Sequence, residues 1–186
     1  EPGKIAIIYK ENKYGEELAT YFRLKKIPLY SKRSIDVLVH PFSNKIIQLL
    51  RYLNAEHDIP YGGDEMLFEI LHFDFYKIPA IEIAKLTVET NTLKYKGEQT
   101  SLRKLLSDKA NRPSQNLFDT GLNENLKVFS FMMENLITGV SNTTLQGLFE
   151  HIIQNAGVLN YILQSDEKIA LLQLLTSLFD FIKEET

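Results

Sequence analysis

The chain has 186 residues, 44% of them hydrophobic and 11% aromatic, which is enough to bury the core of one domain or of one domain and a fragment. A formal net charge of −3 gives no general signal for polyanion binding, and the absence of cysteine excludes disulfides and thiolate metal sites. No apolar run approaches the roughly 20 residues that span a bilayer. We therefore expect a cytoplasmic protein without a membrane partner.

The first predicted element is a buried strand at residues 4–12, a nearly all-apolar run that ends in a polar loop. The backbone groups at both edges of a buried strand need partners. No other stretch of the chain is an equally strong sheet partner. The pattern therefore predicts that the chain is an excised piece of a larger protein.

A helix is predicted next, at about residues 16–25, because Leu18, Tyr21 and Phe22 fall on one helical face. Pro28 forces the residue before it away from helical geometry and ends this helix.

A short extended piece is predicted at residues 27–30, and residues 35–39 are ambiguous between a strand and the start of a helix. Residues 1–39 are therefore expected to form a small α/β part, organised as strand, helix and strand.

The remaining residues, 40–186, are expected to form a mostly helical domain. Ser43 is predicted to cap the first of its helices, and Gly157 to adopt the left-handed conformation that ends a later one. Asp64 is predicted to cap a short helix, and Pro79 suits the first turn of another short helix that carries Ile81, Ala84 and Leu86. The predicted helices are at about 44–54, 65–71, 79–86, 101–107, 123–138, 144–155 and from about 165 onward. The least regular stretch is expected at 87–122.

The motifs of common catalytic sites are missing. Gly62 and Gly63 are followed by Asp64 rather than by the Lys and Ser or Thr of a phosphate loop, and no His pair has metal-binding spacing. The acidic residues near this break identify no third converging metal ligand, so a solvated helix start is the better interpretation. These residues are Glu56, Asp58, Asp64, Glu65 and Glu69. We predict no catalytic residue and no metal site.

The order of several segments resembles the second motor domain of UvrD/RecB-type superfamily 1 DNA helicases, in particular the RecB/AddA branch. The first is Ile5-Ala6-Ile7-Ile8-Tyr9-Lys10-Glu11-Asn12, similar to the strand that carries motif IV. The others are Lys26-Ile27-Pro28-Leu29-Tyr30, the pair Tyr52-Leu53, the stretch from Asp58 to Leu86, and the stretch from Leu148 to Ile162. The resemblance covers nearly the whole chain and is strongest at residues 4–53.

The resemblance implies a fragment of the RecA-like motor with its inserted helical accessory domain. The whole protein would be an ATP-dependent DNA helicase, with or without a nuclease, acting in repair or recombination. ATP and Mg²⁺ would be bound by that whole protein, and its partners would be DNA, the other motor domains and a subunit of a helicase–nuclease complex.

Two residues fall at the nucleotide-binding positions of motif IV. By this resemblance Tyr9 would stack on adenine and Lys10 would reach the γ-phosphate. Lysine departs from the arginine of the family, and it lacks the planar fork that contacts phosphate bidentately. The alternative is a packing role for Tyr9 and a solvated Lys10.

The helical insertion of such helicases contacts DNA, and those contacts are made mainly by Lys and Arg to phosphates. Residues 87–118 hold six basic residues against three acidic ones. The candidate DNA-binding residues are Lys94, Tyr95, Lys96, Arg103, Lys104, Lys109 and Arg112, with Tyr95 placed to stack on a base. A solvated loop with scattered lysines is the alternative for this stretch. An independent helical protein-interaction module is the alternative for the chain.

Overall fold

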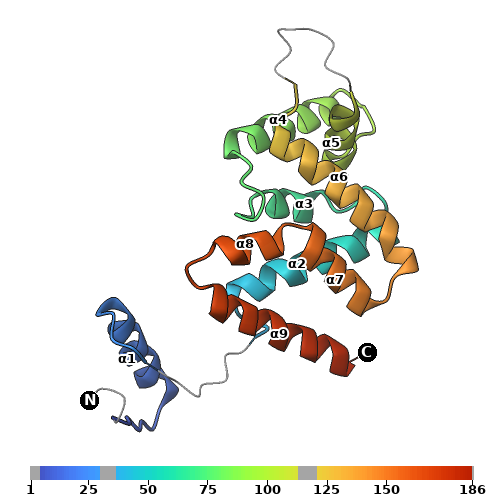
Figure 1. Cartoon of the computed structure of the whole chain (residues 1–186). Helices are drawn as coiled ribbons and strands as arrows, with labels where there is room; N and C mark the ends of the chain where they lie inside the picture. Colours follow the sequence, from blue (N-terminus) through green and yellow to red (C-terminus); the bar gives the residue numbers. More distant parts are fainter. Residues whose placement is uncertain (1–4, 30–36, 113–120, 186) are drawn as a thin grey trace. The chain divides into compact units, whose positions relative to one another are not determined.

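The computed structural model describes residues 5–29, 37–112 and 121–185. The chain divides into two compact units, Glu1–Ile35 and Asp36–Thr186. All regular elements within the described residues are helices (Figure 1). The predicted mostly α class is therefore confirmed.

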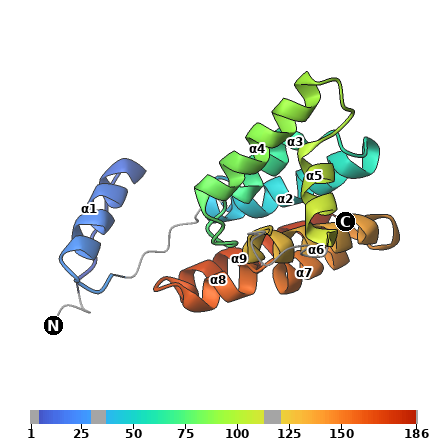
Figure 2. The same cartoon turned by 90° about the horizontal axis from the view of Figure 1, so that it is seen from above.

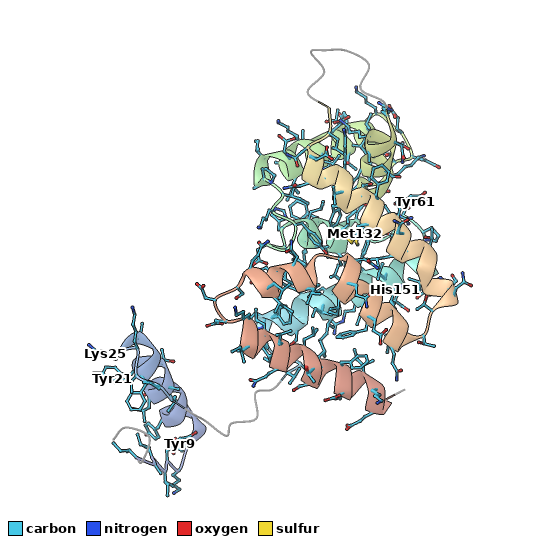
Figure 3. All side chains as sticks on the ribbon, in the orientation of Figure 1. Tyr9, Tyr21, Lys25, Tyr61, Met132 and His151 are labelled. Carbon is cyan, nitrogen blue, oxygen red and sulfur yellow. The ribbon has the colours of Figure 1, made fainter. Side chains whose placement is uncertain are left out.

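The N-terminal unit contains helix α1, Asn12–Leu24. The helix ends where Lys26 adopts a positive φ of 54° and the N–H of Ile27 donates to the carbonyl of Phe22 at 2.9 Å. Such a left-handed residue followed by proline is a common helix end. Lys25 follows the end of α1 directly, and its ammonium lies 5.8 Å from the centre of the ring of Tyr21, both labelled in Figure 3.

The strand predicted at residues 4–12 is not formed within residues 5–12, and Lys4 lies outside the described residues. Residues 5–9 have no strand pairing within the described chain, and Ile5 and Ile8 are exposed. The prediction fails because a strand exists only with a neighbour to accept its backbone hydrogen bonds, and the described residues supply none. Residues 27–29 form no strand either, and residues 37–39 form a turn. Tyr30, Ile35 and Asp36 lie outside the described residues.

The second unit is a body of packed helices (Figures 1 and 2). They are α2 Pro41–Asp58, α3 Asp64–Leu71, α4 Ala80–Tyr95, α5 Leu102–Asn111, α6 Glu124–Gly139, the short 3-10 helix η2 Val140–Asn142, α7 Leu145–Asn155, α8 Val158–Gln164 and α9 Lys168–Glu185. None of these described helices has the length and apolar character needed to cross a membrane.

The core is organised around α2, which packs against α3, α6, α7 and α9. Four of its side chains, Ile46, Leu49, Tyr52 and Leu53, are fully inaccessible to solvent. Their spacing of three and four residues places them on one side of the helix. Residues of the other helices close the core around them, including Phe129, Phe149, Ile152 and Leu178.

Helix α2 starts earlier than the sequence predicted. His40, not Ser43, is its N-cap, and the Nδ1 atom of His40 accepts a hydrogen bond from the N–H of Phe42 at 3.2 Å. Pro41 at the first helical position suits this start, because its missing N–H would have no helical partner there. Ser43 is instead buried inside the helix.

Helix α4 is longer than predicted. It continues to Tyr95 through a Thr-rich stretch expected to be irregular. The hydroxyls of Thr87, Thr90 and Thr92 donate to carbonyls four residues earlier at 2.8–2.9 Å, so these polar side chains are satisfied within the helix. The buried side is Ile83, Leu86 and Thr90, whereas Ile81 and Ala84 are exposed.

Gly157 has a φ of 75°, as predicted, and it connects α7 to α8. The sequence pattern gave no sign of α8, because a helix of seven residues is too short to show a clear period.

Two tyrosines make the unfolding equilibrium sensitive to alkali. Within the described residues, the buried hydroxyls of Tyr52 and Tyr76 have no hydrogen-bond partner. Burial raises the pKa of both above the ordinary value of 10.0, and the charge of Glu56 adds to the effect at Tyr52. Below pH 10.0 both states keep these protons, whereas above it only the unfolded chain releases them.

We therefore expect the free energy of unfolding to fall above pH 10 by about 1.4 kcal/mol per pH unit for each of these tyrosines. The variants Tyr52→Phe and Tyr76→Phe should each be neutral or stabilising at pH 7, since a partnerless buried hydroxyl is lost, and should each reduce the alkaline loss. Urea unfolding at several pH values measures this effect. Tyr95→Phe, at an exposed ring, is the matched control and should leave the pH profile unchanged.

Candidate nucleic-acid interface

The candidate DNA-binding residues lie at the end of α4 and directly after it, on α5, and directly after α5 (Figure 1). Ser101 begins α5 by accepting a hydrogen bond from the N–H of Lys104 at 3.0 Å. This cap fixes the first turn of α5, which carries both Arg103 and Lys104.

Arg103, a predicted DNA contact, lies buried within the helical body rather than on an exposed face. Only 8% of the residue is exposed, and its guanidinium makes two hydrogen bonds to Glu134 at 2.7 and 2.8 Å and one to Glu56 at 2.6 Å. The guanidinium also lies 4.7 Å from the centre of the Tyr61 ring. The hydrogen bonds to Glu134 raise the pKa of Arg103, although burial acts against them. The hydrogen bond to Glu56 raises this pKa further. The structure thus places this arginine between two carboxylates of the body.

Glu56 likewise has an internal role, at the end of α2. One of its oxygens accepts from the N–H of Tyr61 at 2.8 Å and the other from the N–H of Gly63 at 2.9 Å. With Arg103, these bonds satisfy a buried carboxylate. We call the set Arg103, Glu56, Glu134 and Tyr61 the Arg103 cluster. It joins the turn between α2 and α3, where Tyr61 is labelled in Figure 3, to α5 and α6.

The other acidic residues near this turn are also separated from one another. Asp64 accepts from the N–H of Leu102 at 2.8 Å, Asp58 from Asn54 at 3.1 Å and Glu69 from Gln48 at 3.0 Å. Asp64 is the first residue of α3 and not its cap, which is Gly63. Among the described residues no group of three or more potential ligands could hold a metal ion.

Two candidate lysines are paired with carboxylates. Lys94 lies 2.8 Å from Asp64, and Lys109 lies 2.6 Å from Glu89. Each carboxylate neutralises part of the positive charge that DNA would meet. Because both pairs are partly exposed, neither contributes much to the stability of the fold.

The structure leaves three candidate cations exposed with no carboxylate partner among the described residues: Lys96, Lys104 and Arg112. We call these three residues the basic surface. Tyr95 precedes Lys96 and is 95% exposed.

The nucleotide-binding candidates lie in the N-terminal unit. The Tyr9 ring lies over Gly15 of α1, so closely that a methyl group at Gly15 would fall 2.2 Å from the ring. Lys10 is exposed.

One polar site was not predicted from the sequence. Lys45 of α2 forms an ion pair with Asp74 and lies 5.2 Å from the centre of the Phe75 ring and 5.8 Å from that of Tyr161. Burial opposes ionisation of Asp74, but the hydrogen bond and charge of Lys45 prevail and lower its pKa. Burial and the charge of Asp74 raise the pKa of Tyr161. The two nearby aromatic residues Phe73 and Phe75 are the feature of the sequence that could have indicated this site.

Comparison of the chain with protein-family models, with curated proteins and with solved structures finds no match.

Proposed function

We propose that this chain is part of an ATP-dependent DNA helicase of the UvrD/RecB type, and that its helical body binds DNA and regulates the motor without catalysing a reaction itself. The observation that carries this proposal is the contrast between the two units. The second unit has a core of its own, whereas the first exposes the apolar residues Ile5, Ile7 and Ile8. This contrast is expected if the first unit carries a strand that pairs with the rest of a motor domain and the second is an inserted accessory domain that folds around its own core.

In this proposal the apolar run at residues 5–9 pairs with the sheet of the remaining motor. Tyr9 and Lys10 would then complete a nucleotide site whose phosphate loop and Mg²⁺ ligands come from elsewhere in the protein. The location would be cytoplasmic, and the partners would be DNA, the other motor domains and a subunit of a helicase–nuclease complex.

The DNA contacts would be made by the basic surface, that is Lys96, Lys104 and Arg112. Exposed cations without a carboxylate partner bind phosphates at no cost of breaking an ion pair, and each contact releases counterions from DNA. Tyr95 beside them offers an exposed ring for stacking on an unpaired base.

DNA binding by the full chain across a salt series tests the proposal. We expect the triple variant Lys96→Ala, Lys104→Ala and Arg112→Ala to bind a partly single-stranded duplex about tenfold or more weaker, with the slope of log K against log salt reduced by about 2 to 3. Fluorescence anisotropy with a labelled duplex measures both quantities.

The matched control is the double variant Lys168→Ala and Lys183→Ala, which removes exposed lysines of α9. It should bind as the wild type does. An unchanged affinity and salt slope in the triple variant would contradict the DNA-binding surface. Sustained ATP hydrolysis by the isolated chain would contradict the proposal that it catalyses no reaction itself, because its ATP site should be incomplete.

A helical protein-interaction module is the second candidate function. Exposed apolar side chains on α4 favour it.

A further inference from the structure

A carboxylate lies beside the part of the basic surface that Lys96 and Lys104 form. Asp64, the first residue of α3, accepts a hydrogen bond from the N–H of Leu102 at the start of α5. Its other oxygen lies 2.8 Å from the ammonium of Lys94 at the end of α4. Lys96 and Lys104 come from these same two helix ends. Asp64 therefore places a negative charge where the proposed function needs a positive one.

The ion pair of Lys94 with Asp64 can open at little cost. Its side chains are 44% and 25% exposed, so water can replace either partner. Asp64 also keeps its hydrogen bond from the N–H of Leu102, at 2.8 Å, when Lys94 leaves. Arg103 differs, because its side chain is only 10% exposed and its release would leave the buried Glu56 without a countercharge. Lys94 can thus change partner, whereas Arg103 cannot.

Lys94 is also close in the chain to the other proposed DNA contacts. It lies in the last turn of α4 and directly precedes the exposed residues Tyr95 and Lys96. An ammonium released from Asp64 would add a fourth cation to the three of the basic surface. A carboxylate and a DNA phosphate are both anions that accept charge-assisted hydrogen bonds from a lysine, so they compete for Lys94.

We propose that Asp64 is an internal competitor for DNA phosphate, which holds Lys94 in an ion pair that must open before Lys94 can contact DNA. This inference rests on the proposed function and assigns a regulator to that same surface. The wild-type affinity for DNA includes the loss of this pair, and for a partly exposed pair the loss is at most about fivefold. Glu98, in the turn between α4 and α5, is exposed and forms no ion pair within the described residues, so it holds no lysine away from DNA.

Fluorescence anisotropy of the full chain with the partly single-stranded duplex tests this inference. Asp64→Asn keeps an oxygen for the N–H of Leu102 but has no charge to hold Lys94, so it should bind DNA about two- to fivefold tighter than the wild type. Adding Lys94→Ala to Asp64→Asn should remove this gain and reduce the slope of log K against log salt by about 0.7 to 0.9, the share of one phosphate contact. Glu98→Gln is the matched control. It removes a carboxylate near the same helix ends without freeing a lysine, and should change the affinity less than twofold.

Three results would each overturn the inference. They are an Asp64→Asn protein that binds no tighter than the wild type, an equal gain from Glu98→Gln, and a gain from Asp64→Asn that survives the addition of Lys94→Ala. The triple variant of the basic surface separates this failure from that of the proposed function. Weaker binding by the triple variant without a gain from Asp64→Asn would contradict the internal competition alone. A chain that binds no DNA in any of these forms would contradict both.

Discussion

Replacing Arg103 by alanine should lower the free energy of unfolding by about 3 to 5 kcal/mol. The substitution would leave Glu56, a carboxylate in the core, without its countercharge. Glu134 would lose its bidentate partner at the same time. The loss from an unpaired buried charge exceeds that from an exposed ion pair, because water cannot replace the missing partner.

Urea unfolding followed by circular dichroism measures this loss. Lys109→Ala is the matched control on the same helix. It removes a partly exposed pair with Glu89 and should cost at most about 1 kcal/mol. Glu134→Ala should fall between the two, because Glu134 is less buried than Glu56. Equal losses for Arg103→Ala and Lys109→Ala would show that the Arg103 cluster contributes no more to the free energy of unfolding than an exposed ion pair does.

Replacing Gly63 by alanine should destabilise the body by about 1 to 3 kcal/mol. A Cβ atom there would lie 2.8 Å from the Tyr52 ring and 2.9 Å from a carboxylate oxygen of Glu56. Tyr52 is fully buried, and Glu56 is fixed by Arg103 and by the N–H groups of Tyr61 and Gly63. Neither side chain can move away without breaking a packed contact or a hydrogen bond.

Gly139→Ala is the control for this substitution. Gly139 has a helical φ of −77°, and apart from its chain neighbours and the backbone of its own helix no atom lies within 4 Å of the position of its added Cβ. Alanine should therefore be neutral or stabilising there, by up to about 1 kcal/mol. Thermal unfolding of the two variants measures the difference. A Gly63→Ala protein as stable as the wild type would mean that the turn between α2 and α3 adjusts more easily than its contacts indicate.

The positions of the helices in the body were largely predictable, because apolar residues such as Phe129, Met133 and Leu148 recur with helical spacing. The orientation of α4 was not. Its apolar residues lie on two sides, so the sequence alone could not identify which side faces the core. Of the apolar residues Ile81, Ala84 and Leu86 that marked this helix in the sequence, only Leu86 is buried, together with Ile83.

The candidate DNA surface shows a second limit of sequence reasoning. Arg103 and Lys104 are neighbours in the sequence and equally basic, yet one is buried and the other exposed. The partners of Arg103 are 47 and 31 residues away, at Glu56 and Glu134, so no local pattern contains this information. The strand predicted at residues 4–12 fails for a related reason, since its formation depends on a neighbour rather than on its own residues.

The adjacency of Arg103 and Lys104 has a mechanical consequence. The backbone at Lys104, where a phosphate would bind, is restrained because Arg103, one residue earlier, is tied to α2 and α6 through the Arg103 cluster. Little motion of that backbone would remain to be frozen when a ligand arrives, so the entropic penalty of binding at Lys104 would be small. Arg103→Ala, which removes this restraint, should therefore lower the affinity of Lys104 for a ligand that does not contact Arg103.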